Sequence, residues 1–458
     1  MADRENFGSK LGATLAAAGS AVGLGNIWRF PVETGQNGGA AYILIYIACI
    51  ILLGIPIMTS EFLIGRATHS NTAGAYRKLA PGTQWKWVGR LGVLSGFMIY
   101  CYYSVVAGWT LAYSLFAVLN HFAGKGTDDF TAIFQDFASH PVYPVLCMAI
   151  FFLATHFIVV RGVKKGIEKF SKLMMPSLFL IVIILVFCSV NLPGAGKGLE
   201  FLLKPDFSKI TGGTVLNAMG QAFFSLSLGL GCLCTYASYF SKDTNLVKTT
   251  GSVCFIDTMV ALLAGFIIFP AVFNAGMSLS PDDVGPSLIF ITLPSVFNES
   301  FAGAPSLGYL FSVMFYLLLV LAALTSTISI HEVVNAYVSE EFHIKRKKSA
   351  LIVTLTCMAI GVLCALSFGV LSDVKVFGMT FFDLFDFAAS NILLPLGGLF
   401  ISLFAGWKLD KVFFRDQLTN SGTIKAPHLP ALRFILRYLA PLAIGAILIN
   451  QLKGIFMS

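Results

Sequence analysis

Two hydrophobic stretches of the chain combine closely spaced glycines with polar residues that could bind charged solutes. Residues 18–26 read AGSAVGLGN, and residues 227–231 read SLGLG. Because glycine costs roughly 1 kcal/mol relative to alanine inside a helix, both stretches favour local unwinding. Backbone groups freed inside a bilayer have no water to bond, so their natural partners are a cation on the carbonyls and an anion on the amides. The pattern predicts a transport site in the middle of a membrane.

Three further polar groups lie within apolar runs. Asp257 has only apolar residues at 254–256 and 259–261 near it. A carboxylate costs roughly 2.5–3.5 kcal/mol at the centre of a span, and less near its end. Thr325 and Ser326 are adjacent hydroxyls in another apolar run, where hydroxyls often bond back to their own helix.

The composition places the whole chain in lipid. Its 458 residues are 56% hydrophobic and only 12% charged, whereas soluble domains carry about 25% charged residues. The nine cysteines all lie within or at the edge of apolar runs and show no metal-ligand spacing, which is typical of small buried side chains. No short apolar segment followed by a cleavage site is evident, so we expect no secretory signal peptide.

The elements that must position these residues are membrane-spanning helices. Counting the apolar runs of about 20 residues, with the two broken ones, predicts about eleven spans. The first seven are expected at residues 11–34, 41–64, 92–119, 144–160, 167–190, 215–240 and 250–275, and the last four begin near Leu307, Ser349, Phe377 and Leu432.

The broken runs are the first and the sixth, so the defect recurs after five spans. Because five is odd, the second unit would enter the membrane in the opposite orientation. We therefore predict an all-α polytopic membrane protein, a 5+5 inverted repeat with spans 1 and 6 broken at mid-membrane. Residues 1–458 would form a single transporter membrane domain, with repeats at 1–190 and 214–407 and an extra C-terminal span at 430–455.

The basic residues gather in every second loop. They cluster in residues 77–90, 161–172, 345–348 and 408–415, whereas the loops at 127–140 and 278–304 are nearly free of Lys and Arg. This positive-inside bias predicts a multi-pass protein of the cell membrane with a cytoplasmic N-terminus and, for eleven spans, an external C-terminus. The net charge of +8 is thereby explained without a nucleic-acid partner.

Several motifs, in order along the chain, resemble those of the neurotransmitter:sodium symporter family and its bacterial amino-acid transporter branch. Residues 19–31 with the following NGG at 37–39 are similar to the first-span signature of that family. Residues 102–103, 224–231 and 322–326 are similar to its third, sixth and eighth spans. The resemblance covers essentially the whole chain. It implies a sodium-coupled secondary symporter, not an enzyme, that imports a hydrophobic or aromatic amino acid by alternating access.

The resemblance also implies two sodium sites and no organic cofactor. The first would use the Ala21 carbonyl, the Asn26 side chain, Ser225 and Asp257; the second would use the carbonyls of Gly19, Val22 and Ala322 with the hydroxyls of Thr325 and Ser326. Chloride-dependent relatives are expected to have Asn near position 257 and Ser one turn later. Here Asp257 and Ala261 stand there, which implies that a fixed carboxylate replaces the anion and that transport is chloride-independent.

The implied substrate site lies between the two breaks. Its residues would be Ser20, Ala21, Leu24, Gly25, Ile99, Tyr102, Tyr103, Phe224, Ser227, Leu230, Ser326, Thr327 and Ile330. The substrate carboxylate would meet the amides of Leu24 and Gly25 and the Tyr103 hydroxyl. Monoamine-selective relatives have an aspartate where this chain has Gly23, so an amino acid with its carboxylate is expected. Leu230, in place of an aromatic residue, leaves room for a large side chain.

Charged residues at the two ends of the bundle are expected to act as gates. The resemblance implies an outer pair of Arg29 with Asp386, and an inner pair of Arg4 with Glu340. Phe7, Ser238 and Tyr239 would pack around the inner pair. The family usually has Asp at position 340 and Trp at position 7, so the inner gate departs modestly from the pattern. Glu61 would brace the broken segments by accepting freed amides.

Other functions remain alternatives. A proton-coupled amino-acid transporter on the same fold would use Asp257 or the His331–Glu332 pair as proton carrier, although that pair also fits a structural role. A membrane-embedded hydrolase would need a nucleophile beside a base, and His156 and His331 have no convincing partners in the sequence. A receptor-like protein that binds without transporting is a further alternative.

Overall fold

The computed structural model describes residues 5–276, 288–426 and 428–456, and this part of the chain folds into helices and their connections. The β structure recorded within it is one isolated antiparallel bridge, between Val376 and Met379. In the same residues, eight helices are long and apolar enough to cross a membrane, or up to ten if each of two bent pairs is one span. The all-α membrane class is therefore confirmed, and the count of eleven spans stays a prediction.

The long helices follow the predicted runs, and all but the tenth begin earlier in the chain than expected. Their bounds are Ala40–Thr68 (α3, η2, α4), Lys86–Val118 (α6), Tyr143–Val159 (α8), Val163–Val190 (η3, α9), Leu246–Asn274 (α13), Pro305–Glu341 (α15), Arg346–Leu366 (α16), Phe381–Lys408 (α17, η6, α18, η7) and Leu429–Phe456 (α20, η8, α21). Shorter helices are Thr72–Leu79 (α5), Thr127–Ser139 (α7), Ala195–Leu203 (α10), Leu293–Ser300 (α14) and Lys411–Leu418 (α19).

The expected start of the tenth span near Phe377 was wrong by one turn. Phe377 has a φ of 53° and Gly378 a φ of 79°, so the chain turns there between the two bridge residues. The helix begins only after Thr380, whose side chain accepts a hydrogen bond from the Asp383 amide as its N-cap. Such a cap fixes a helix start more firmly than hydropathy does.

The first predicted break is present between α1 (Lys10–Ala21) and the η1–α2 segment (Gly25–Gln36), which bend by 53°. Val22 is extended, with a ψ of 112°. A Cβ atom added at Gly23 would overlap the Ser326 Oγ, and one at Gly25 would lie 2.8 Å from the Phe224 ring. The glycines of this break therefore allow the backbone to lie close to Ser326 and Phe224, and they do not adopt left-handed conformations.

The second predicted break lies between α11 (Gly212–Ser225) and α12 (Cys232–Ala237). Here the backbone itself requires glycine, because Gly229 and Gly231 have φ values of 81° and 80°. Ser227 shares the left-handed region with a φ of 52°. A Cβ atom at Gly229 would lie 2.5 Å from the Leu394 carbonyl oxygen, so the break also packs backbone to backbone on α18 (Leu394–Leu403).

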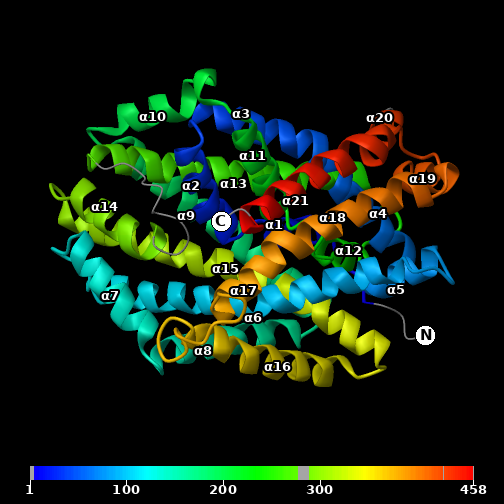
Figure 1. The fold of residues 1–458 in the computed structure, drawn as a ribbon, viewed down its shortest axis with the longest axis horizontal. Helices are drawn as coiled ribbons and strands as arrows, with labels where there is room; N and C mark the ends of the chain where they lie inside the picture. Colours follow the sequence, from blue (N-terminus) through cyan, green and yellow to red (C-terminus); the bar gives the residue numbers. More distant parts are fainter. Residues whose placement is uncertain (1–4, 277–287, 427, 457–458) are drawn as a thin grey trace.

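Figure 1 shows how the breaks are placed within the bundle. Helices α6, α8, α15 and α16 pack on one another in the lower part of the view, and α3, α10, α11 and α13 lie in the upper part. The α1 half-helix packs against α9, α13 and α15, and α12 packs against α4. Both breaks thus face the interior, where α6 and α15 also present residues.

Candidate ion and substrate site

A buried cavity lies between the two breaks, α6, α15 and α18. Its volume is about 40 Å³. Its lining consists of Ala21, Gly23, Leu24, Gly25, Ile99, Tyr103, Phe224, Ser225, Ser227, Leu230, Ser326, Ile330 and Leu394. Pockets that bind small molecules are usually about 300–1,000 Å³ in volume, so this cavity is small for a ligand site.

All the predicted substrate residues line this cavity except Ser20, Tyr102 and Thr327. The Thr327 hydroxyl lies 2.9 Å from that of Thr155 on α8, and the Tyr102 hydroxyl lies 3.2 Å from that of Ser390. Thr327 directly follows the cavity residue Ser326, and Tyr102 directly precedes the cavity residue Tyr103. Successive helical residues point about 100° apart, so both hydroxyls face away from the cavity. Ser20 contributes its carbonyl, which accepts a hydrogen bond from the Ser227 hydroxyl at 3.2 Å.

Leu394 is a cavity residue that the sequence interpretation missed. It directly follows the π-helical segment Phe387–Leu393 (η6). An extra residue per turn in such a segment shifts every later side chain around the helix. The only local signal is Pro395, and it does not predict which face Leu394 takes.

The predicted carboxylate-binding groups converge at the first break. The Leu24 amide donates to the Tyr103 hydroxyl at 3.2 Å. A Cβ atom at Gly23 would lie 3.2 Å from the same hydroxyl, besides overlapping Ser326. Because the Leu24 amide already donates to this hydroxyl, the Tyr103 phenol is left as a donor at the start of η1. Freed N–H groups at such a position favour an anionic group.

The first predicted ion-binding group is assembled around Asn26. Its amide nitrogen lies 2.7 Å from Asp257 Oδ1, 3.0 Å from the Asp257 carbonyl oxygen and 3.1 Å from Ser225 Oγ. Ser225 donates in turn to Asp257 Oδ2 at 2.8 Å, and the Gly23 amide donates to Asn26 Oδ1 at 3.0 Å. These are hard oxygen ligands that fit a sodium ion. The Asn26 amide would have to turn its oxygen toward that ion.

The second predicted ion-binding group joins α15 to the end of α1. Both Thr325 and Ser326 place their hydroxyl oxygens 3.3 Å from the Val22 carbonyl oxygen. Thr325 also bonds back to the Ala322 carbonyl at 2.9 Å, so the local and the inter-helix contacts coexist. A Cβ atom at Gly19 would lie 3.4 Å from that of Thr325. The set again offers only hydroxyl and carbonyl oxygens, which suit a hard cation.

Glu61 braces the second break, as expected. Its Oε1 accepts a hydrogen bond from the Gly229 amide at 2.9 Å, and the residue is fully buried. A carboxylate that accepts a freed amide satisfies a group that would otherwise destabilise the unwound segment.

The structure gives the outer gate residues other partners than those expected. Arg29 lies 3.8 Å from Glu33, and its guanidinium stacks 4.7 Å from the centre of the Phe224 ring. Asp386 accepts a hydrogen bond from the Ser390 hydroxyl at 2.9 Å. Among the ion pairs of the described residues, Arg29 pairs with Glu33 and not with Asp386. The predicted outer pair is therefore not formed here: Arg29 contacts Glu33 and the Phe224 ring, and Asp386 bonds to Ser390.

The inner gate is only partly within the described residues, since Arg4 lies outside them. Glu340 accepts hydrogen bonds from the Asn71 amide at 2.8 Å and from its side chain at 3.0 Å. Phe7 packs edge-on against Tyr239, with ring centres 6.1 Å apart, and its amide donates to the Tyr239 carbonyl at 3.0 Å. The predicted aromatic packing is present, and the Arg4–Glu340 pair stays a prediction.

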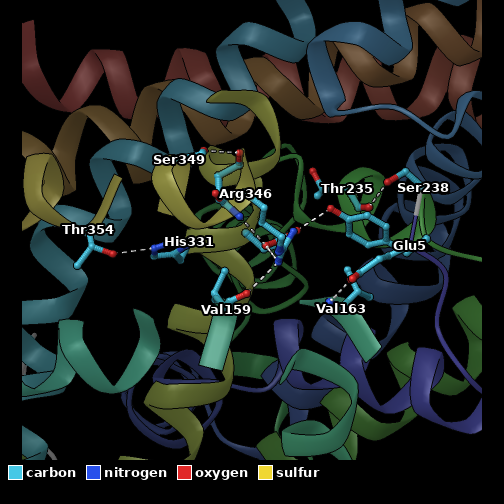
Figure 2. Close-up of polar contacts among 12 residues, drawn as sticks. Glu5, Val159, Val163, Thr235, Ser238, His331, Arg346, Ser349 and Thr354 are labelled. Carbon is cyan, nitrogen blue, oxygen red and sulfur yellow. Dashed lines mark hydrogen bonds and ion pairs between the residues drawn. The ribbon is translucent and has the colours of Figure 1, made fainter. Parts of the chain in front are cut away.

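His331 and Glu332 bond to different neighbours, and Figure 2 shows His331 pointing to Thr354. Glu332 is fully buried and forms a bidentate pair with Arg346, at 2.7 and 2.6 Å, while Tyr239 donates to it at 2.6 Å. His331 instead contacts the Thr354 hydroxyl at 2.9 Å. A carboxylate so fully bonded favours the structural interpretation of this pair over a proton carrier. Arg346 lies in the basic cluster at residues 345–348, which is expected in a loop, so the sequence does not predict this role for it.

Comparisons with known proteins agree with this geometry. Residues 4–129 and 135–456 match the Sodium:neurotransmitter symporter family. An uncharacterized sodium-dependent transporter of Bacillus subtilis (strain 168), YhdH, is 40% identical over 97% of this chain and 97% of its own. A second uncharacterized sodium-dependent transporter, from Haemophilus influenzae, is 36% identical over 89% of this chain and 90% of its own.

Among solved structures, MhsT in complex with L-phenylalanine is similar in both fold and sequence. The TM-score is 0.88 at 42% identity, and the match covers 98% of this chain and 100% of MhsT. Together with the two interrupted helices and the oxygen-lined cavity between them, these matches show that the chain belongs to the sodium:neurotransmitter symporter family, whose members are membrane transporters and not enzymes.

Proposed function

We propose that this protein is a sodium-coupled symporter that imports a hydrophobic or aromatic amino acid by alternating access. The observation that carries the proposal is the cavity between the two breaks. Apolar side chains there lie beside a backbone N–H group, hydroxyl groups and a carboxylate. Ile99, Leu230 and Ile330 form its apolar side. The related MhsT structure contains L-phenylalanine, which supports an aromatic substrate.

The residues have distinct roles in this proposal. Leu24, Gly25 and Tyr103 would bind the substrate carboxylate, and the Ala21 and Phe224 carbonyls with Ser227 would bind its ammonium group. Asn26, Ser225 and Asp257 would hold one sodium ion, and Val22, Thr325 and Ser326 would hold part of the shell of a second. A bound sodium supplies positive charge that attaches the α1 end to α11, α13 and α15.

Coupling requires the ion to bind one conformation better than the other, because equal affinity shifts no population. Both proposed ion groups use α1 carbonyls or residues next to the first break, so cation binding would fix α1 against α15. Release would free α1 and open the cytoplasmic side. The small volume of the cavity, about 40 Å³, fits a protein in which substrate entry and helix movement occur together.

Two further features belong to the same proposal. Asp257 lies in the first ion group and Ala261 one turn later is buried, which supports transport without chloride. The alternation of basic and non-basic loops supports a cytoplasmic N-terminus in the cell membrane, and the two breaks support the division into repeats at residues 1–190 and 214–407.

Uptake into proteoliposomes tests the proposal directly. Purified protein is first screened by thermal shift against the amino acids in sodium and in potassium buffer. We expect stabilisation by large apolar amino acids in sodium alone, and sodium-driven accumulation of the same compounds with or without chloride. Uptake that persists without sodium but is abolished by a protonophore would establish proton coupling instead. Binding without accumulation would indicate a receptor.

A further inference from the structure

A buried carboxylate of the fifth predicted span holds the N-terminal end of the α1 half-helix, which is the end far from the break. Glu168, in the segment Val163–Glu168 (η3), is 2% exposed. Its Oε2 accepts a hydrogen bond from the Gly8 amide at 2.5 Å, and its Oε1 accepts one from the Ser9 hydroxyl at 2.9 Å. Ser9 is itself the N-cap of α1 and accepts from the Gly12 amide at 3.0 Å. One carboxylate thus fixes the helix start through its capping residue.

The contact is reciprocal. Glu5, in the chain before α1, accepts a hydrogen bond from the Val163 amide at 2.6 Å, at the first residue of η3 (Figure 2). Gly162 precedes it with a φ of 88°, and a Cβ atom there would lie 2.8 Å from the Glu5 carboxylate. Each of the two segments therefore has one backbone amide, at its helix start or just before it, bonded by a carboxylate from the other segment.

Glycine makes the approach of α1 to Glu168 possible. A Cβ atom at Gly12 would lie 2.5 Å from Glu168 Cγ and would overlap its carboxylate. At Gly8, a Cβ atom would lie 3.2 Å from Glu168 Oε2. The fit is too close for any side chain at position 12, so the position of the carboxylate and that of α1 depend on each other.

The charge of Glu168 is balanced within its own helix. Lys172 lies 2.6 Å from Glu168 Oε1, four residues along. Glu200 and Lys204 form a pair with the same spacing at 3.0 Å, but there both side chains are largely exposed. Exposed pairs of this kind contribute little. Of these two similar Glu–Lys pairs, the first bonds to the residues that begin α1, whereas the second makes no such contact in the part of the chain that the structure describes.

We propose that Glu168 is a positioning residue for the cation site at the other end of α1. The inference rests on the proposed function, in which the Val22 carbonyl binds sodium with Thr325 and Ser326. Because α1 has only 12 residues and is interrupted after Ala21, it can move as a unit about the break. The Glu168 contact holds this unit on α9, so that the Val22 carbonyl stays beside α15. Its release lets α1 leave α15 and opens the site to the cytoplasm.

The experiment compares Glu168→Gln with Glu200→Gln, its match in the exposed pair. Hydrogen–deuterium exchange by mass spectrometry follows residues 5–21 and 163–168 in detergent, in potassium and in sodium buffer. The sodium dependence of substrate binding is titrated in parallel. For Glu168→Gln we expect faster exchange in both segments and a half-saturating sodium concentration raised about tenfold, with substrate affinity in saturating sodium unchanged. Glu200→Gln should match the parent protein in every measurement.

Gly12→Ala provides a second variant if Glu168→Gln does not fold. Alanine favours helix over glycine, so faster exchange of α1 in this variant can only come from displacing Glu168. Unchanged exchange and unchanged sodium dependence in the variants, or equal changes in Glu200→Gln, overturn the proposal. If the parent protein binds substrate equally in sodium and potassium, the proposed function fails instead, while the exchange measurement still reports on α1.

Discussion

The side-chain nitrogen of Asn26 lies 2.7 Å from Oδ1 of Asp257, and no part of either side chain is exposed. This hydrogen bond joins the segment after the first break to the middle of α13. It also brings a carboxylate next to Ser225, at the end of α11. Residues from three distant parts of the sequence thus surround one position, and the negative charge there has a geometric reason to attract a cation.

Replacing Asp257 by asparagine tests that attraction. The variant keeps the shape and removes the charge, so we expect the half-saturating sodium concentration for uptake to rise at least about tenfold, equivalent to roughly 1.4 kcal/mol. Asp206→Asn, at an exposed cap, is the control and should behave as the parent protein. An unaltered sodium titration in Asp257→Asn would exclude a cation at this position.

Gly23→Ala tests the need for close approach at the first break. The added methyl group would overlap Ser326 and press on Tyr103, so substrate affinity should fall by about tenfold or more. Gly251→Ala in α13 has nothing within 4 Å of the new Cβ and should bind normally. Binding assays with radiolabelled amino acid compare the two, and equal affinities would contradict the assigned site.

Thr325→Val and Thr327→Val separate two hydroxyls that are two residues apart. Only Thr325 faces the Val22 carbonyl, whereas Thr327 bonds to Thr155. We therefore expect Thr325→Val to weaken sodium-dependent uptake roughly tenfold, since an ion ligand is lost. Thr327→Val should lower thermal stability slightly at most, with its sodium titration unchanged. If Thr327→Val weakened sodium-dependent uptake more than Thr325→Val, the ion would have to bind elsewhere.

Arg346→Gln tests whether Glu332 is a structural anion. Removing one partner of a buried pair costs about 3–5 kcal/mol, because the remaining charge is left without compensation. We expect a lower midpoint of thermal unfolding, partly restored in the double variant with Glu332→Gln. If Glu332→Gln alone kept full stability but abolished a pH-driven uptake, Glu332 would be a proton carrier.

Leu230→Trp tests how substrate size is limited. Leu230 forms part of the apolar side of the cavity, and a larger side chain there would compete with the substrate for the same space. The affinity for aromatic amino acids should fall at least about tenfold, while that for small apolar ones is retained. Competition assays with a series of unlabelled amino acids measure the affinity for each of them. An equal loss of affinity for all of them would contradict a limit set by substrate size.

The sequence predicted the breaks well because their signals are local. Clustered glycines mark both, and the structure interrupts the helices after Ala21 and after Ser225. The physical reasons differ, however. Positive φ values require glycine at Gly229 and Gly231, whereas Gly23 is needed for clearance against a helix that lies about 300 residues away in the chain. Propensity alone does not distinguish these cases.

Features set by irregular helix geometry, by a choice between side-chain partners or by distant contacts could not be predicted. The orientation of Leu394 follows from a π-helical turn, and the partner of Arg29 follows from the helix on which Glu33 lies one turn away. The role of Glu168 depends on the fold bringing residues 8 and 168 together. In the sequence it was one acidic residue within a basic segment, and nothing nearby indicated that it would be buried.

The crossing of the second break over α18 involves bare main chain on both sides, since Gly229 meets Leu394, Gly397 and Gly398 there. Side chains that interlock must disengage before two elements can slip past each other. Because no side chains of these residues interlock at the crossing, we expect little steric resistance to small displacements of the second break along α18. Replacing any of these three glycines by a larger residue would push the two backbones apart and prevent such a displacement.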